Sequence, residues 1–399
     1  MKKLLLLGGL RYLIPVIKAA QNMGHYVITC DYLPENIAHK YSDEYHNVSI
    51  LDKDAVLKLA QKLKIDGIMS FAVDPGVTTA AYVSENMNIP SPGPYNSVNI
   101  LQNKGLFRAF LEKHNFNVPK SRTFNNNYEA ISTISDFELP VIVKPVDSAG
   151  SKGVMKVSNE DELPKAIENA LSNSPSKTFI IEDYLQGKTF SSDSDSFSVN
   201  GDLKFVSFSN QRFDANSPNP YTPSAYSWPS SISEENQNYL KSELQRLITL
   251  LKMESSIYNI EVREATNGKA YIMEVSPRGG GNRLSEMVKS VTGIDLISMS
   301  IQAALGEEIS KVFQPKYNGS WAEIILYSNV NGFFKELYIE PVLNEYLKEI
   351  DIWVNEGDKV NAFIGANETI GTLVLQCENA SSLESILADY TKYIKVIVN

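Results

Sequence analysis

The first part of the chain alternates regularly between strand-like and helix-like segments, and this alternation constrains the fold most. Apolar runs typical of buried strands occupy residues 3–9, 25–31 and 66–71, and helical periodicity occupies residues 12–24 and 54–64. Strands that alternate with helices form parallel sheets, because each helix carries the chain back across the sheet in a right-handed crossover. The sequence therefore predicts a Rossmann-like parallel sheet at the start of the chain.

The pattern changes after a proline-rich stretch at residues 89–97. From about residue 139 the strands follow one another in pairs, and two pairs turn at Asn200-Gly201 and Asn267-Gly268. Asn-Gly between apolar segments is a strong signal for an antiparallel hairpin. We therefore expect a mixed α/β and α+β chain. Its expected units are a Rossmann-like domain at residues 1–100, two further units at residues 101–180 and 181–310, and a small C-terminal α/β subdomain at residues 311–399.

The composition argues against several classes of protein. A net charge of −10 opposes nucleic-acid binding, which requires a basic surface. The only cysteines, Cys30 and Cys377, have no metal-binding spacing and fit a reducing cytoplasm. No apolar run approaches the about 18 residues of a membrane span, and we interpret the opening MKKLLLLGGL as a first strand rather than a signal peptide. We expect a cytoplasmic protein without nucleic-acid or membrane partners.

A glycine-rich hairpin follows the strand that carries Lys144. The loop at residues 148–153 consists of small residues around a single lysine, and such a loop exposes backbone N–H groups to a ligand. Lys144 lies among apolar residues, where an ammonium group requires an anion. A polyphosphate would satisfy both features. The alternative is a flexible surface hairpin with a lysine at the strand end.

Two glutamates lie at similar distances from the turn of one predicted hairpin. Glu261 is on the first strand and Glu274 on the second, so an even register brings their side chains together on one face. Two carboxylates inside a sheet repel each other unless a cation lies between them, and Mg²⁺ typically takes one or two carboxylates together with phosphate oxygens. The alternative is one solvent-facing carboxylate and one paired with Arg263.

The segment after Glu274 reads Ser-Pro-Arg-Gly-Gly-Gly-Asn-Arg. Arg278 would stand beside the metal and the terminal phosphate, where a guanidinium stabilises the charge of a transferring phosphoryl group. We expect the glycines at residues 279–281 to let the backbone pass close to the substrate. Asn282 and Arg283 add donors for a carboxylate or a phosphate, or make only structural contacts.

Other segments are less informative. The strand and turn at residues 179–187 would present backbone groups to an adenine edge, or would simply be a core strand that ends in solvent. Arg212, Tyr226 and Trp228 fall in a polar and aromatic stretch that we predict to be a long loop. Such a loop would shape a substrate site or act as a structural cover. The four histidines all precede the proposed phosphate site and form no catalytic triad: His25, His39, His46 and His114.

Together these motifs resemble the ATP-grasp superfamily. In chain order they are a helix with Lys104, the strand lysine with its glycine hairpin, Glu182-Asp183-Tyr184-Leu185, Glu261, and Glu274-Val-Ser-Pro-Arg278. The resemblance is to the carboxylate–amine ligase branch, which includes L-amino-acid ligases and relatives of the carbamoyl-phosphate synthetase large chain. It covers roughly residues 1–310 and implies a two-part ATP-grasp fold after the Rossmann-like domain.

The resemblance also implies roles for individual residues. Arg278, Lys144 and Arg283 would be catalytic, and Glu261, Glu274 and Ser276 would bind Mg²⁺, with Mn²⁺ as an alternative. The residues expected to bind ATP are Lys104, Lys144, Ser148, Ala149, Gly150, Ser151, Gly153, Glu182, Asp183, Tyr184, Leu185 and Asp193.

Two positions depart from the family pattern. Ser276 stands where many members have an asparagine, so a second metal would be held less firmly. Thr189 stands where many members have a ribose-binding glutamate, and we expect Asp193 to replace it.

The function implied is ATP-dependent amide formation. A small carboxylate, such as an amino acid, would be activated as an acyl-phosphate and joined to an amine on an amino acid or amino sugar, with release of ADP and phosphate. The alternatives are a bicarbonate-dependent carboxylase and a non-catalytic nucleotide-binding protein. Many relatives form homodimers, and we allow for one here.

Overall fold

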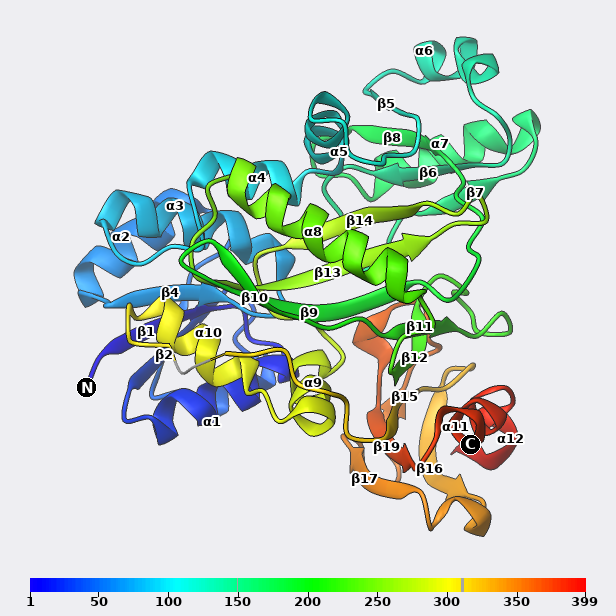
Figure 1. Cartoon of the computed structure of the whole chain (residues 1–399). Helices are drawn as coiled ribbons and strands as arrows, with labels where there is room; N and C mark the ends of the chain where they lie inside the picture. The colour runs from blue at the N-terminus through cyan, green and yellow to red at the C-terminus, as the bar shows by residue number, and fades with distance from the viewer. Residues whose placement is uncertain (149, 310–311) are drawn as a thin grey trace.

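The structure is a computed structural model that describes residues 1–148, 150–309 and 312–399. The chain begins with a parallel sheet in the order β3-β2-β1-β4, as predicted (Figure 1). Its strands are β1 (Lys3–Leu7), β2 (Tyr26–Asp31), β3 (Glu44–Asn47) and β4 (Gly67–Ser70), and its helices are α1 (Ile14–Asn22), α2 (Lys53–Leu63) and α3 (Val77–Met87). The short edge strand β3 was not predicted, because its sequence EYHN lacks an apolar run.

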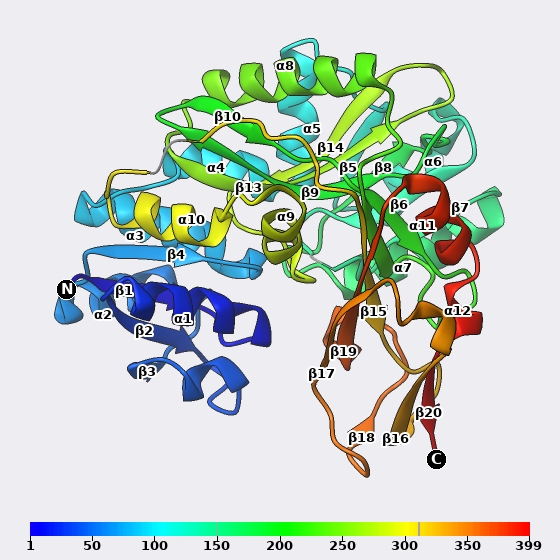
Figure 2. The same cartoon turned by 60° about the horizontal axis from the view of Figure 1, so that its bottom comes forward.

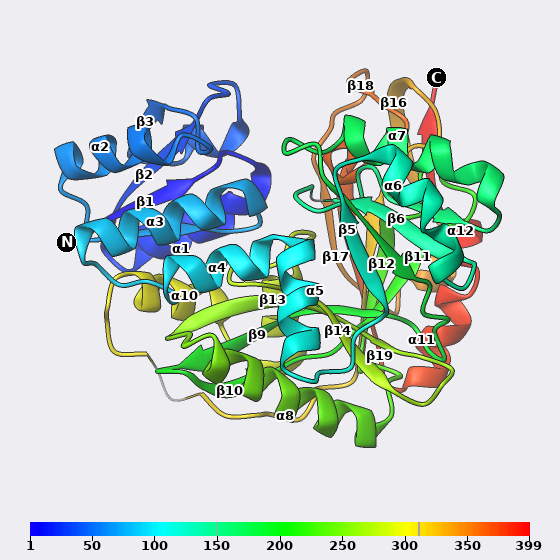
Figure 3. The same ribbon diagram turned by 90° about the horizontal axis from the view of Figure 1, so that it is seen from above.

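A second sheet is antiparallel, with the order β5-β8-β6-β7. Its elements are β5 (Ser121–Phe124), α6 (Asn127–Ser132), β6 (Val141–Pro145), β7 (Met155–Val157), α7 (Leu163–Ser172) and β8 (Phe179–Asp183). The glycine-rich hairpin is confirmed, because β6 pairs with β7. Two helices lead into this unit, α4 (Tyr95–Gln102) and α5 (Lys104–Lys113), and α5 lies beside the second sheet (Figure 3).

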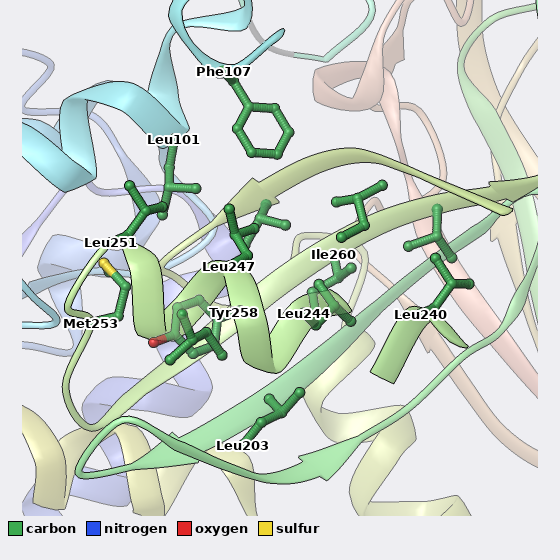
Figure 4. Packing of buried hydrophobic residues seen from close by; sticks show 14 of the residues in the cluster. Leu101, Phe107, Leu203, Leu240, Leu244, Leu247, Leu251, Met253, Tyr258 and Ile260 are labelled. Atoms are coloured by element: carbon green, nitrogen blue, oxygen red, sulfur yellow. The ribbon is translucent and has the colours of Figure 1, made fainter. Parts of the chain in front are cut away.

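The third sheet forms the centre of the molecule, with the order β10-β9-β13-β14. Its strands are β9 (Ser192–Val199), β10 (Asp202–Val206), β13 (Ser256–Glu264) and β14 (Ala270–Ser276). Both predicted Asn-Gly hairpins are present. Helix α8 (Glu234–Leu250) covers one face, and its leucines at 240, 244 and 247 pack against Ile260 and Tyr258 of β13 (Figure 4). This apolar layer fixes the central hairpin rigidly on one side, which leaves its other side for polar residues.

The stretch around Tyr226 differs from the predicted long loop. It forms strands β11 (Asn210–Phe213) and β12 (Pro223–Trp228), so Arg212, Tyr226 and Trp228 lie in a sheet and not in a long loop. Three C-terminal strands complete this sheet, in the order β11-β12-β15-β19-β17. They are β15 (Ser320–Leu326), β17 (Leu347–Ile352) and β19 (Gly371–Cys377). Strand partners so distant in sequence leave no local signal in the segment itself.

The remaining elements complete the C-terminal part of the chain (Figure 2). Helices α9 (Leu284–Thr292) and α10 (Leu296–Ala304) follow the central sheet, and α10 packs against α1 of the first domain. A small sheet, β18-β16-β20, contains β16 (Gly332–Ile339), β18 (Lys359–Val360) and β20 (Ile394–Val398) and is accompanied by α11 (Ala380–Leu387) and α12 (Tyr390–Tyr393). Among the helices that the structure describes, none has the length and apolar character needed to cross a membrane.

Candidate active site

Three carboxylates stand in a row across the central sheet. Glu261 of β13 lies directly opposite Glu274 of β14 on one side and Asp193 of β9 on the other. Opposite residues in an antiparallel pair project to the same face, so the predicted Glu261–Glu274 pair is formed, and Asp193 extends it. Arg263, the alternative partner for a glutamate, donates instead to the carbonyl of Leu185 at 3.1 Å.

The three carboxylates repel one another when no cation lies between them. Burial and then the neighbouring Glu274 raise the pKa of Glu261 above its usual value. Burial and then Glu261 raise the pKa of Asp193 to about 7. Within the described ranges no three acidic, histidine or cysteine side chains are arranged to hold a metal ion by themselves. The donor set therefore suits a Mg²⁺ ion that takes one or two carboxylates and fills its other positions with phosphate oxygens and water.

Asp193 and Ser276 have partners that the sequence did not indicate. Asp193 accepts hydrogen bonds from Asn259 (2.7 Å) and from the Tyr226 hydroxyl (3.3 Å), and its expected contact with a ribose stays a prediction. Ser276 accepts a hydrogen bond from Gln102 at 2.6 Å and donates to Asp74 at 3.2 Å. The Ser276 hydroxyl therefore supports a polar network, and its role as a metal ligand also stays a prediction.

Lys104 connects the metal-side carboxylates to the glycine loop. Its Nζ lies 3.2 Å from Glu274 Oε2 and donates to the Ser148 carbonyl at 3.0 Å. Burial lowers the pKa of Lys104, but Glu274 and Asp74 outweigh that effect and raise it, so the ammonium stays charged. The lysine begins α5, where the Asn103 side chain caps the helix by accepting from the N–H of Leu106. The cap fixes where the lysine projects.

Lys144 lies on strand β6, as predicted, and its ammonium group pairs with Glu182. A second cation, Arg108, also pairs with Glu182 and was not identified from the sequence. Lys144 Nζ lies 2.5 Å from Glu182 Oε1, and Arg108 Nε lies 3.0 Å from Glu182 Oε2. Arg108 also donates to the carbonyl of Met273 at 2.8 Å and is 2% exposed. The sequence feature that could have identified Arg108 was an arginine on the apolar face of a helix, next to Phe107. Burial would raise the pKa of Glu182, but Arg108 and Lys144 lower it to about 2.

The glycine loop has the expected backbone character. Gly150, Ser151 and Gly153 adopt positive φ values of 66°, 58° and 76°, and a Cβ on Gly153 would lie 2.8 Å from Pro145. Ala149 lies outside the described residues.

The hinge residues at the end of β8 already have hydrogen-bond partners. The N–H groups of Asp183 and Tyr184 donate to the carbonyls of Lys120 and Pro140, at 2.9 and 3.2 Å. Lys156 lies over the Tyr184 ring at 4.0 Å from its centroid. These two N–H groups could therefore contact an adenine only after their present hydrogen bonds break.

Arg278 is held by the N-terminal domain. Its Nε and Nη2 donate to the two oxygens of Asp74, each at 2.7 Å, and its Nη1 donates to Asn259 at 3.2 Å. Asp74 begins a short 3-10 helix (Asp74–Gly76) just after β4. Burial would raise the pKa of Asp74, but Arg278 lowers it, and the pair stays ionic. The sequence signal for Asp74 was a carboxylate at the carboxyl end of a parallel strand, where ligand sites gather.

Two of the three glycines have a packing role that the sequence did not indicate. A Cβ on Gly279 would lie 2.2 Å from the Phe71 ring, and one on Gly280 would lie 2.6 Å from Leu284. The carbonyl of Gly279 also accepts from the N–H of Ala72 at 3.1 Å. Two of the glycines thus permit close packing, and only Gly281 faces open space.

Arg283 projects toward the C-terminal sheet. It lies 2.8 Å from Glu349 of β17, 3.3 Å from Glu286 and donates to Thr372 of β19 at 2.9 Å. No contact that the structure describes joins Arg283 to the carboxylate row. Its catalytic assignment therefore stays a prediction.

A family model for the ATP-grasp domain matches residues 137–286. The chain contains an ATP-grasp domain. The matched ATP-grasp residues include Lys144, Glu182, Glu261, Glu274 and Arg278, whereas Lys104, Arg108, Asp74 and Gln102 come from outside the match. The preceding part of the chain therefore completes the candidate site of the ATP-grasp domain.

Two relatives with similar sequences are much longer than this chain. The carbamoyl phosphate synthase large chain of Clostridium beijerinckii is 23% identical over 300 residues, which is 74% of this chain and 27% of that protein. The corresponding chain of Clostridium perfringens strain 13 is 24% identical over 302 residues, 73% of this chain and 27% of that one. This ATP-grasp chain spans about a quarter of the length of these relatives.

Solved structures share the fold over the whole chain. The L-amino acid ligase from Bacillus licheniformis superposes with a TM-score of 0.80 at 19% identity, covering 100% of this chain and 99% of that one. Phosphoribosylglycinamide synthetase from Anaerococcus prevotii gives 0.76 at 21%, covering 100% of both chains. N5-carboxyaminoimidazole ribonucleotide synthetase from Thermotoga maritima gives 0.75 at 16%, covering 100% of both. These likenesses show that the chain shares the overall fold of these structures, including the residues on both sides of the matched domain.

Proposed function

We propose that this chain is an ATP-dependent ligase that joins a carboxylate to an amine and releases ADP and phosphate. One observation carries the proposal: Glu261 and Glu274 face each other across β13 and β14, with Lys104 at 3.2 Å from Glu274. Paired carboxylates suit a divalent cation, and adjacent half-buried lysines suit polyphosphate oxygens.

The residues of the site divide between binding and charge stabilisation. Lys104, Lys144 and the loop from Ser148 to Gly153 would bind the phosphates of ATP, and residues 182–185 would bind the adenine. Glu261 and Glu274 would hold Mg²⁺ or Mn²⁺, which neutralises phosphate charge when bound. Arg278 would stabilise the phosphoryl group during transfer, and Asp74 fixes the plane of its guanidinium.

The proposed reaction has two steps. A carboxylate oxygen attacks the γ-phosphorus of ATP, and the bond from that phosphorus to the ADP oxygen breaks. The amine nitrogen then attacks the acyl-phosphate carbon, loses a proton, and phosphate leaves. Positioning and charge stabilisation are sufficient for both steps, so no nucleophilic side chain is needed.

A second candidate is a carboxylase that activates bicarbonate. Solved structures with the same fold include N5-carboxyaminoimidazole ribonucleotide synthetases and a biotin carboxylase from Campylobacter jejuni. The third alternative, a non-catalytic nucleotide-binding protein, is disfavoured because Lys144, Glu261, Glu274 and Arg278 are all present and close to charged partners.

The proposal includes a cytoplasmic location and small-molecule partners. Both cysteines are unpaired and buried, which fits a reducing compartment. A homodimer is also proposed, because a fold relative, the biotin carboxylase domain of the Hydrogenobacter thermophilus 2-oxoglutarate carboxylase, is a dimer.

The test is ADP release from MgATP with a matrix of carboxylates and amines, with and without bicarbonate. Release that requires a carboxylate and an amine together supports the ligase. Release that requires bicarbonate supports the carboxylase instead. Binding of ATP without ADP release under any condition would favour a binding protein.

A further inference from the structure

A cavity lies where the N-terminal domain meets the central sheet. It is enclosed by strand β4, helix α3, the proline-rich stretch at residues 89–97, the start of β13 and helix α10, and α10 lies beside β4 (Figure 2). Its volume is about 40 Å³, which is room for about three water-sized groups. It shares Pro90, Ser91, Ser255 and Ala303 with a wider cleft of about 470 Å³. The inner cavity and the outer cleft therefore form one pocket, which we call the connector pocket.

None of the described side chains that line the inner cavity has a hydrogen left to donate to a ligand. Five of them are serines, and each serine hydroxyl already donates to an oxygen atom of the protein. Three are prolines, which have no N–H group, and the others are apolar. An anion such as a phosphate or a carboxylate would therefore find no side-chain donor in the cavity. The serines are Ser70, Ser91, Ser255, Ser256 and Ser300, and the prolines are Pro90, Pro92 and Pro277.

The outer cleft carries an excess of negative charge. Three of its lining residues are the glutamates Glu254, Glu307 and Glu308. Lys2 Nζ and His25 Nε2 lie 3.5 and 3.4 Å from the carboxylate of Glu307. Among the residues that the structure describes, no ion pair involves Glu254 or Glu308, and both are exposed. The cleft therefore favours a positively charged ligand, because a concave surface of one charge attracts the opposite charge.

The two parts of the pocket together suit an ammonium group on an aliphatic chain. The apolar inner cavity would bury the chain, and the acidic outer cleft would hold the charge. A metal ion is less suitable, because no three acidic, histidine or cysteine side chains of the described residues are arranged to hold one. The volume of the outer cleft falls within the range of about 300–1,000 Å³ that small-molecule sites have. The ligand class is therefore a small organic cation.

The inner cavity ends beside the ion pair of Asp74 and Arg278. Pro277, which lines the cavity, directly precedes Arg278. Ser70, which also lines it, donates to the carbonyl of Val73, the residue before Asp74. None of the described lining residues of either part belongs to the carboxylate row, the glycine loop or the hinge. A ligand in the pocket would therefore contact neighbours of both ion-pair residues without entering the proposed ATP site.

We propose that the connector pocket is an effector site for a small primary ammonium compound with an aliphatic chain. The chain enters the inner cavity, and the ammonium group stays in the outer cleft at Glu254 and Glu308. Binding there acts on the ATP site through Pro277 and Ser70, because a closely packed interior transmits small displacements to its neighbours. The inference goes beyond the proposed ligase function and does not depend on it, because it concerns the binding of a second ligand and not turnover.

Isothermal titration calorimetry with butylammonium, methylammonium and butyrate tests the site. We expect butylammonium to bind the natural protein about 10-fold or more tightly than the other two, because methylammonium lacks the chain and butyrate has the opposite charge. Glu254→Gln combined with Glu308→Gln should weaken butylammonium binding about 5-fold or more. The matched control combines Glu112→Gln with Glu378→Gln, which removes the same charge at two exposed positions outside the pocket. The control should bind butylammonium as the natural protein does.

A further variant tests the inner cavity. Ala303 lines both parts of the pocket, and Ala303→Leu would place a larger side chain in it. Butylammonium should lose its advantage over methylammonium in this variant, and thermal unfolding shows whether the variant stays folded. Coupling to the ATP site is measured by titrating a non-hydrolysable ATP analogue with Mg²⁺ at several butylammonium concentrations. We expect the affinity for the analogue to change about 2-fold or more and then to level off once the pocket is filled.

Several results would overturn the proposal. Butylammonium that binds no more tightly than butyrate or methylammonium would contradict the site, and so would equal binding by the Glu254 and Glu308 double variant and the natural protein. An unchanged affinity for the ATP analogue would contradict the effector role. An affinity that keeps falling in proportion to the butylammonium concentration would indicate competition for one site and would contradict a separate pocket. None of these results decides the ligase proposal, which ADP release with carboxylates and amines tests independently.

Discussion

Arg278 and Asp74 form a two-bond ion pair that joins the central sheet to the N-terminal domain. Both Asp74 oxygens accept from the guanidinium at 2.7 Å, and Asn259 and Ser276 complete the network. The two residues are 204 positions apart in the chain. The parallel sheet therefore does more than precede the ATP-grasp domain, because it supplies the anion that orients the candidate catalytic arginine.

Replacing Asp74 tests this relationship. We expect Asp74→Asn to reduce ADP formation by about 10- to 100-fold, because a misoriented guanidinium stabilises the transferring phosphoryl group poorly. Steady-state kinetics should show the loss mainly in kcat. Asp54→Asn, on the exposed surface of the same domain, is the control and should retain normal rates. An unchanged kcat in Asp74→Asn would contradict the catalytic role of Arg278.

Replacing Glu274 tests the metal assignment. We expect Glu274→Gln to remain folded and to lose about 1,000-fold or more of its turnover, because the cation would lose a charged ligand and Lys104 its partner. Thermal unfolding and ADP release at increasing Mg²⁺ concentration would be measured side by side. The exposed Glu112→Gln on α5 provides a comparison. Full activity of Glu274→Gln would contradict the paired-carboxylate site.

The depressed pKa of Glu182 predicts a specific dependence of stability on pH. Arg108 and Lys144 outweigh burial and lower the pKa of Glu182 to about 2, from the 4.5 of an unpaired glutamate. The unfolding free energy that ionised Glu182 contributes is therefore fully present above pH 4.5 and is lost as pH falls toward 2. Between pH 7 and pH 3 the natural protein should lose about 2 kcal/mol more unfolding free energy than Glu182→Gln. Urea unfolding at both pH values measures this difference, and equal losses would show that Glu182 is not held ionised.

The glycines after Arg278 offer a matched pair of substitutions. Gly279→Ala places a methyl group 2.2 Å from the buried Phe71 ring and should lower the unfolding free energy by about 1–3 kcal/mol. Gly281→Ala meets no atom within 4 Å. It should change stability by less than about 0.5 kcal/mol. Denaturant unfolding of both variants decides the point, and equal stability would contradict the packing role of Gly279.

The sequence determined the features that depend on local pattern. Periodicity predicted the parallel sheet, because a buried strand and an amphipathic helix each leave a signature within a few residues. The Asn-Gly turns predicted both hairpins, and distance from the turn was enough to place Glu261 opposite Glu274. The ATP-grasp resemblance rested on motif order, and the match to residues 137–286 bears it out.

The tertiary structure alone decided which distant residues meet. Asp74 reaches Arg278, Arg108 reaches Glu182, and Glu323 of β15 comes to lie beneath α9 only because separate helices and sheets pack together. Strands β11 and β12 were expected to be a loop. Strand β11 pairs with β12, and the second partner of β12, β15, comes about 100 residues later in the chain. Contacts of this kind arise from the packing of whole elements. A pattern along the sequence indicates which face of a helix or strand a residue occupies. It does not indicate which other elements that face contacts.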